Sequence, residues 1–458
     1  MKDIAGFVQE HICDDTARLI LNRSKWPEID MDLAVASIES RRKLKNKVQE
    51  WHDHPGLVFP VRLSAEQCSS SATAKYKAEL AASIAGSQMR LADLTGGLGV
   101  DSWFFSKYAS HVLYNDMQET LCKAAKYNFK ELDAKNINVS NIEIQADSSD
   151  LDKLLSGFKP DIVFMDPARR GEGGKKVFLI EDCTPDVLTL RKDIFSHTRH
   201  ILIKLSPMAD ISMVCSRLGP TCREVHVVAY GGECKELLIW MDREWNGEYS
   251  ITAVEISRLA SLARNDSIAT LSSNDTPLSS RNTFLLSRDT SLSSRDTLLS
   301  SRDTLLSSRD TLLSSRDTLL SSRDTLLSSR AQSRDLFLFE PGKALMKAGF
   351  FDLISDHFGV HKMGVSTHYY VTDDKSKLED LEKFGKVYNI ISIQPLDKRT
   401  IKAAGKEYPH SEVTARNIPM DTETLRKKLG VTSGDDAHIF GLKSDSLGNL
   451  LIIGKRSV

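Results

Sequence analysis

Residues 90–101 read R-L-A-D-L-T-G-G-L-G-V-D, a short apolar run that ends in an acid and passes directly into a glycine-rich turn. The run predicts a buried strand, and the turn predicts a loop that leads into a helix. Glycines tolerate positive φ angles and let a ligand approach the backbone closely. A lone glycine-rich loop also fits a dinucleotide site, so this stretch by itself does not name the ligand.

Five further apolar runs follow this stretch, and helix-length segments lie between several of them. The predicted strands are HVLYND (111–116), IEIQAD (142–147), DIVFMD (161–166), HILIKL (200–205) and VHVVAY (225–230). Such alternation is typical of a doubly wound α/β sheet. Ligands of these sheets bind at the carboxyl ends of the strands, so the residues at those ends are the candidate site.

An acid closes each of the first four predicted strands: Asp93, Asp116, Asp147 and Asp166. The separation of Asp93 and Asp116 is about that at which an acid meets ribose hydroxyls in nucleotide-binding sheets. Each acid alone could serve as a helix cap or a turn former. Four in succession at strand ends favour a shared ligand.

The motifs DLTGGLGVD and DPARR, with the acids between them, resemble class I S-adenosylmethionine-dependent methyltransferases. Together with EQCSSSATAKYKAEL, IKLSP and GGECKELL they resemble a bacterial group of such enzymes that carries a C-terminal THUMP-like domain. LFEPGKALMKAGFF and ARNIPMDTETLRKKLGVTSGDDAHIFG are similar to that group's ferredoxin-like and THUMP-like segments. The resemblance implies a Rossmann-like fold, S-adenosylmethionine as cofactor, and structured RNA (rRNA or tRNA) as partner.

The resemblance also implies roles for the strand-end residues. Gly97 and Gly99 would pass beneath the methionine part of the cofactor, Asp116 would hold the ribose and Asp147 the adenine. Asp166 would face the target beside the methyl group. The candidate cofactor-binding residues are Asp93, Thr95, Gly97, Gly99, Asp116, Asp147 and Asp166.

The candidate catalytic residues are Asp166, Pro167, Arg169 and Lys204. A carboxylate at 166 can accept a hydrogen bond from an exocyclic amine, and Pro167 fixes the turn. Enzymes that methylate amines usually carry an aromatic residue where this chain has Arg169, which leaves the methylated atom open. Methylation of pyrimidine C5 is less favoured, because the next strand ends at Lys204-Leu205 without a cysteine nucleophile. Lys204 either contacts substrate or pairs with a neighbouring acid.

The rest of the chain divides by composition. Residues 1–88 are predicted to be helical, with Asp32 capping a basic helix that faces either solvent or nucleic acid. Residues 89–245 form the methyltransferase domain. Residues 246–335 contain SSRDTLL repeats between 272 and 330, whose adjacent leucines make a poor coiled-coil seam. We expect a disordered linker there, with a short β-solenoid or a weak helix as the alternatives. Residues 336–385 are expected to be a ferredoxin-like segment and 386–458 a THUMP-like domain.

Residues 386–458 hold 12 Lys and Arg against 8 Asp and Glu, a net charge of +4. A solvated face or an RNA-binding surface would explain this excess, since RNA affinity comes largely from phosphate contacts. The candidate RNA-binding residues are Arg170, Arg416, Arg426, Lys427 and Lys428.

Composition limits the remaining alternatives. The formal charge of −1 gives no global sign of nucleic-acid binding, and the seven cysteines form no CxxC motif. We therefore expect reduced thiols, no metal site, no membrane span and a cytoplasmic location. Two other functions remain open at this point: methylation of a protein or small molecule, and a catalytically inactive RNA-binding protein.

Overall fold

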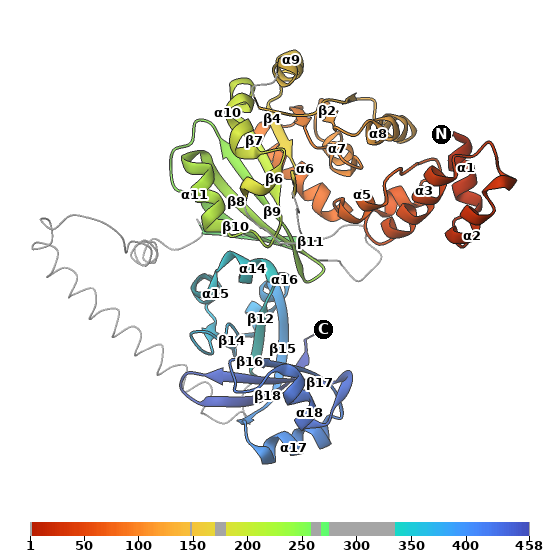
Figure 1. Cartoon of the computed structure of the whole chain (residues 1–458). Helices are drawn as coiled ribbons and strands as arrows, with labels where there is room; N and C mark the ends of the chain where they lie inside the picture. The colour runs from red at the N-terminus through yellow and green to blue at the C-terminus, as the bar shows by residue number, and fades with distance from the viewer. Residues whose placement is uncertain (1, 147–148, 170–179, 258–266, 274–334, 458) are drawn as a thin grey trace, which may run out of the picture. The chain divides into compact units, whose positions relative to one another are not determined.

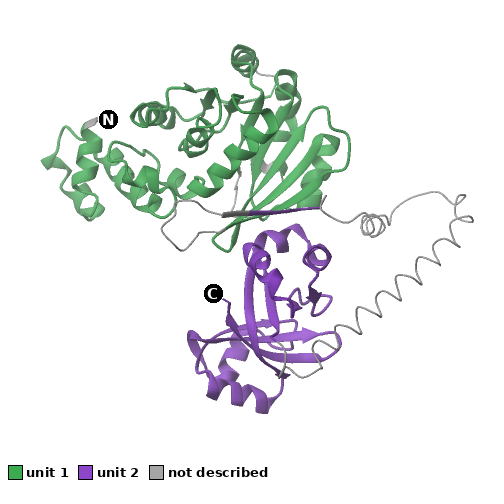
Figure 2. Cartoon of the chain, turned by 180° about the vertical axis from the view of Figure 1, so that it is seen from behind, with its two compact units in different colours: residues 1–266 green, residues 267–458 purple. Residues whose placement is uncertain are grey.

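A computed structural model describes residues 2–146, 149–169, 180–257, 267–273 and 335–457 (Figure 1). Two compact units divide the chain, Met1–Asp266 and Ser267–Val458, and Figure 2 colours them separately. Asp147, Arg170 and most of the SSRDTLL repeat lie outside the described residues. Within the described ranges, no helix is both long and apolar enough to cross a membrane.

Eight strands of the first unit lie in one sheet in the order β10-β8-β9-β7-β4-β1-β2-β3. Their bounds are β1 Arg90–Asp93, β2 His111–Asn115, β3 Ile137–Ser140, β4 Ile162–Met165, β7 His200–Leu205, β8 Cys222–Tyr230, β9 Glu233–Asp242 and β10 Ser250–Ser257. The first five run parallel, and β9 is antiparallel to both β7 and β8. The chain order reverses between β1 and β4, which is where such sheets bind their ligands.

Helices cover both faces of this sheet, with α6 and α7 on one side and α10 and α11 on the other (Figure 1). The helices of this unit are α1 Lys2–Glu10, α2 Thr16–Leu21, α3 Met31–Leu44, α4 Gln49–Asp53, α5 Arg62–Gln67, α6 Ser71–Ala85, α7 Val100–Phe105, α8 Glu119–Glu131, α9 Ser149–Phe158, α10 Val187–His197 and α11 Ile211–Leu218. Asp186 and Asp210 cap α10 and α11 through their side chains.

The N-terminal helices share a core with the sheet. Val48, Trp51 and Phe59 pack in one cluster with Phe164 and Leu202, and all five side chains are buried. The segment 1–88 therefore does not have a core entirely of its own, although α1 and α3 add a smaller cluster around Val8 and Ile38.

The predicted basic helix differs in two respects. Asp30, rather than Asp32, caps α3, and the helix ends at Leu44. Arg41 is only 5% exposed and donates to the carbonyl oxygens of His52, His54, Pro55 and Leu57. Arg41 faces neither solvent nor nucleic acid, because it satisfies the backbone of a loop.

The third and last strands of the sheet also depart from the predictions. The third strand is Ile137–Ser140 and not 142–147, because the Asn115 side chain bonds both N–H and carbonyl of Ile142 and ends the ladder there. Strand β9 was not predicted, and β10 lies beyond the expected domain end at 245.

The second unit contains β11 Ser267–Ser272 and one seven-stranded sheet in the order β13-β14-β12-β15-β18-β17-β16. Those strands are β12 Phe337–Pro341, β13 His361–Lys362, β14 Tyr370–Thr372, β15 Gly385–Pro395, β16 His410–Arg416, β17 Thr432–Ser444 and β18 Gly448–Arg456. Its helices are α14 Lys343–Ala348, α15 Phe351–Phe358, α16 Leu378–Phe384, α17 Lys398–Glu407 and α18 Thr422–Leu429. The long strand β15 joins the two predicted C-terminal segments in one sheet.

Candidate active site

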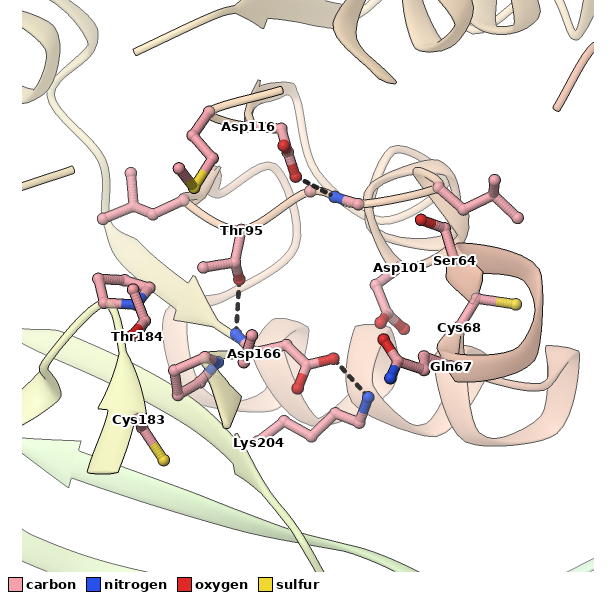
Figure 3. Close-up of a pocket in the computed structure, with 18 of the residues that line it drawn as sticks. Ser64, Gln67, Cys68, Thr95, Asp101, Asp116, Asp166, Cys183, Thr184 and Lys204 are labelled. Atoms are coloured by element: carbon pink, nitrogen blue, oxygen red, sulfur yellow. Dashed lines mark hydrogen bonds and ion pairs between the residues drawn. The ribbon is translucent and has the colours of Figure 1, made fainter. Parts of the chain in front are cut away.

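A cavity of about 830 Å³ opens at the carboxyl ends of β1, β2, β4 and β7 (Figure 3). It collects most of the residues that the sequence singled out in this unit. Those residues are Thr95, Gly97, Gly99, Asp116, Asp166, Pro167 and Lys204. Strand ends that are far apart in the sequence therefore meet at the switch point of the sheet.

The glycine-rich loop forms the floor of this cavity. Gly97 and Gly99 have φ angles of +54° and +94°, which favour glycine. A Cβ on Gly96 would lie 2.2 Å from the Tyr114 ring, so this position has no room for a side chain. A Cβ on Gly97 would meet only Thr95 O, at 3.9 Å, so the backbone there is open to a ligand.

Asp116 accepts backbone hydrogen bonds from this loop and from its own turn between β2 and α8. Its Oδ2 accepts the Gly97 N–H at 2.9 Å, and its Oδ1 accepts the Gln118 N–H at 2.8 Å. A carboxylate has about four lone-pair sites, so two remain for hydroxyl groups. The next residue, Met117, is 58% exposed and lines the cavity with Ile142 and Ile144, which together offer apolar contact for a planar ring.

Asp93 does not line the cavity, contrary to the predicted cofactor contact. It is 1% exposed, and it accepts the Ser102 hydroxyl at 2.6 Å and the Thr95 N–H at 3.1 Å. Asp93 therefore links the glycine-rich loop to the start of α7 by hydrogen bonds. Burial raises the pKa of Asp93 to about 7, with the hydrogen bonds from Ser102 and Thr95 opposing the shift.

This pKa makes a testable contribution to stability. The Asp93 carboxyl binds its proton more tightly in the folded state than in the unfolded chain, so protonation of Asp93 stabilises the fold. This stabilisation is complete below about pH 4 and is lost as the pH rises to 7. Asp93→Asn should remove that dependence, about 1.4 kcal/mol per pH unit. Urea unfolding at pH 5, 6, 7 and 8 measures the difference between wild type and variant. Parallel stability profiles for the two proteins would contradict a buried, titrating Asp93.

Thr95 and Lys204 fix Asp166 from two directions. The Asp166 N–H donates to Thr95 Oγ1 at 2.6 Å, and Lys204 Nζ donates to Asp166 Oδ2 at 2.5 Å (Figure 3). Burial alone lowers the pKa of Lys204, but the carboxylates of Asp166, Glu236 and Asp101 outweigh it and raise that pKa above its ordinary value. Of the two roles considered for Lys204, the structure shows pairing with an acid.

Pro167 is buried, and the chain then forms β5, Ala168–Arg169, which pairs with β6, Cys183–Thr184. Arg169 stands opposite Cys183 in this hairpin. Cys183 and Cys68 both line the cavity, and neither was among the predicted site residues. Burial raises the pKa of the Cys68 thiol to about 11, which makes its thiolate scarce at neutral pH.

Several lining residues come from an element that sequence reasoning missed. Helix α5 and the residue after it place Ser64, Gln67 and Cys68 along one wall, facing Asp101 of α7 (Figure 3). Asp101 could have been noticed, because it follows the glycine-rich loop by two residues. Gln67 lies in the quoted motif EQCSSSATAKYKAEL, to which no role was given.

The predicted RNA-binding residues of the second unit lie on two neighbouring elements, β16 and α18. Arg416 ends β16 and is exposed, as are Lys427 and Lys428 on α18. Arg426 is only partly exposed and lies 3.4 Å from Glu412, so an acid already compensates its charge. Among the described residues, no three His, Cys, Asp or Glu side chains gather as a potential metal site.

Comparison with known proteins agrees with this architecture. Family models match residues 337–377 as a ferredoxin-like domain and residues 385–456 as a THUMP domain-like region. The crystal structure of a "putative methyltransferase" from Porphyromonas gingivalis W83 is 24% identical, covers 100% of this chain and 98% of its own, and has a TM-score of 0.73. No curated protein sequence matches significantly.

Two other crystal structures match only part of the chain. An rRNA methylase from Streptococcus thermophilus is 12% identical and covers 36% of this chain and 93% of its own, with a TM-score of 0.27. A putative methyltransferase from Streptococcus mutans in complex with SAH is 14% identical and covers 37% of this chain and 96% of its own, with a TM-score of 0.26. The full-length match confirms the predicted fold, a Rossmann-like α/β sheet followed by ferredoxin-like and THUMP-like regions.

Proposed function

We propose that this protein is an S-adenosylmethionine-dependent methyltransferase that acts on a base of rRNA or tRNA, with an exocyclic amine as the methylated group. The observation that carries the proposal is the meeting of the open glycine loop, Asp116 and the Lys204-paired Asp166 in one cavity. When bound, the cofactor supplies an electrophilic methyl group. Gly97 and Asp116 would hold it, and Met117, Ile142 and Ile144 would contact its planar ring.

Asp166 is placed to orient the target amine. Lys204 occupies one lone-pair site of the Asp166 carboxylate. The Asp166 side chain is still 35% exposed, so its other lone-pair sites can accept an N–H from the target. A nucleobase amine is neutral at pH 7 and needs orientation more than deprotonation. An alkylammonium side chain would first have to lose a proton to a base. This difference favours a nucleobase over a protein lysine.

An RNA partner is supported by a basic surface on α17 and α18, which pack together. Gly405 makes the close approach possible, since a Cβ there would lie 1.8 Å from Leu429 O. The exposed cations of this surface are Lys398, Arg399, Lys402, Lys406, Lys427 and Lys428. In the part of the chain that the structure describes, none of these six forms an ion pair with an acid. Exposed cations of this kind bind phosphates.

Replacing Lys398, Lys402 and Lys406 with Gln should weaken RNA binding and reduce its salt dependence. Each lost phosphate contact lowers the slope of log affinity against log salt by about 0.7–0.9. Filter binding of total tRNA and rRNA at several salt concentrations measures both. The matched control replaces Lys375, Lys377 and Lys383, which pair with acids in the same unit. Equal effects of the two triple variants would contradict phosphate binding by the lysines of α17.

Methyl transfer itself tests the proposal. The protein is incubated with methyl-labelled cofactor and either total RNA or a protein extract. Label that enters RNA supports the proposal, whereas label that enters only protein contradicts it.

A further inference from the structure

A network of buried charges holds the carboxylate of Asp101 at the cavity wall. Lys77 is 0% exposed, and its Nζ lies 2.6 Å from Ser69 Oγ, 3.0 Å from both carboxylate oxygens of Glu236 and 3.1 Å from Asp101 Oδ1. The Ser69 hydroxyl donates to Asp101 Oδ2 at 2.8 Å. Two groups of the N-terminal region thus fix the position of a carboxylate on α7.

Asp101 has unused hydrogen-bonding capacity on the side of the cavity. Its side chain is 12% exposed and lines the cavity between the glycine loop and Gln67 (Figure 3). The Ser69 hydroxyl takes one of about four lone-pair sites, and Lys77 forms an ion pair with Oδ1 without a hydrogen bond, so other sites can accept further donors. Lys77 also has Glu236 as a partner, and therefore does not fully neutralise Asp101.

The charge of the surrounding wall favours a cation. Among the described residues, the charged ones that line the cavity are four carboxylates, those of Asp101, Asp116, Glu143 and Asp166, and two amines, those of Lys204 and Lys235. Lys204 is already paired with Asp166, and Lys235 with the exposed Glu233. Asp116 already accepts the Gly97 N–H, and Asp93 is buried and does not line the cavity. Asp101 lines the cavity two residues after Gly99.

We infer that Asp101, positioned by Lys77 and Ser69, accepts the α-ammonium group of the cofactor's amino-acid part. This inference rests on the proposed function. It gives the N-terminal region a role in cofactor binding, with Lys77 and Ser69 as positioning residues. The contact is specific to the amino-acid end, so it should be energetically separable from the ribose contact of Asp116.

Binding of three compounds tests the inference without measuring activity. S-adenosylhomocysteine carries the amino-acid part, 5′-methylthioadenosine lacks it, and S-adenosyl-3-thiopropylamine keeps the amine but lacks the carboxylate. Asp101→Asn should weaken the first and third by about 10-fold or more, the usual loss for a hydrogen bond to a charged group, and change 5′-methylthioadenosine less than about twofold. Ser69→Ala should give a smaller loss with the same selectivity.

Asp116→Asn is the matched control, and should weaken all three compounds because each contains ribose. An Asp101→Asn variant that binds S-adenosylhomocysteine as wild type does, or loses 5′-methylthioadenosine equally, would overturn the assignment of Asp101. A wild-type protein that binds none of the three would instead overturn the proposed function. Calorimetry on the full chain distinguishes these outcomes.

Discussion

Asp166→Asn should lower methyl transfer by about 10²–10³-fold while leaving the affinity for S-adenosylhomocysteine within a few-fold of wild type. Lys204 donates to the Asp166 carboxylate, and the Thr95 hydroxyl accepts the Asp166 backbone N–H, so the orientation of the residue is set before the target arrives. An amide at this position presents one acceptor where the carboxylate presents two oxygens. The loss should therefore fall on the turnover of bound substrate more than on cofactor binding.

Single-turnover rates and calorimetry measure the two quantities separately. Asp133→Asn is the control, because Asp133 is 79% exposed and pairs with Lys135 at the surface. It should leave both the rate and the affinity unchanged. Full activity in Asp166→Asn would remove Asp166 from the reaction, and loss of cofactor affinity in parallel with rate would make it a binding residue only.

Lys77→Met should destabilise the first unit by about 3–5 kcal/mol, because it leaves Glu236 and Asp101 without their buried cation. Burial already raises the pKa of Glu236, an effect that Lys77 and Lys204 oppose. Adding Glu236→Gln to Lys77→Met should restore part of the loss, since one unpaired charge is then removed.

Urea unfolding followed by tryptophan fluorescence measures this change in the right unit, because all five tryptophans lie within residues 26–245. Lys75→Met is the matched control on the same helix. Lys75 is 42% exposed and lies 3.9 Å from Glu79, so its loss should cost less than about 1 kcal/mol. Equal destabilisation by the two substitutions would contradict the buried network.

Much of the site could be predicted from the residues that end each parallel strand. Asp116, Gly97 and Asp166 meet because parallel strands deliver their carboxyl ends to one edge, and that rule needs no knowledge of side-chain packing. The rule does not predict that Asp101 lines the cavity and that Asp93 is buried. Both flank the same loop, and a hydrogen bond from Ser102 decides that Asp93 turns inward.

Long-range contacts account for what the sequence did not show. The third strand ends early because the Asn115 side chain bonds the backbone at Ile142, a contact across 27 residues. Lys77 and Glu236 are 159 residues apart, and their pairing depends on α6 packing against the sheet. Arg41 belongs to a basic run of the sequence, yet it is buried and donates hydrogen bonds to four backbone carbonyl groups.

The most direct test of RNA base methylation by Asp166 is identification of the labelled nucleoside. Total RNA is methylated with labelled cofactor by wild type and by Asp166→Asn, digested to nucleosides and analysed by mass spectrometry. The proposed function predicts label on a nucleoside methylated at an exocyclic amine, and its near-complete loss in the variant. Label on a pyrimidine C5, or undiminished label in the variant, would contradict it.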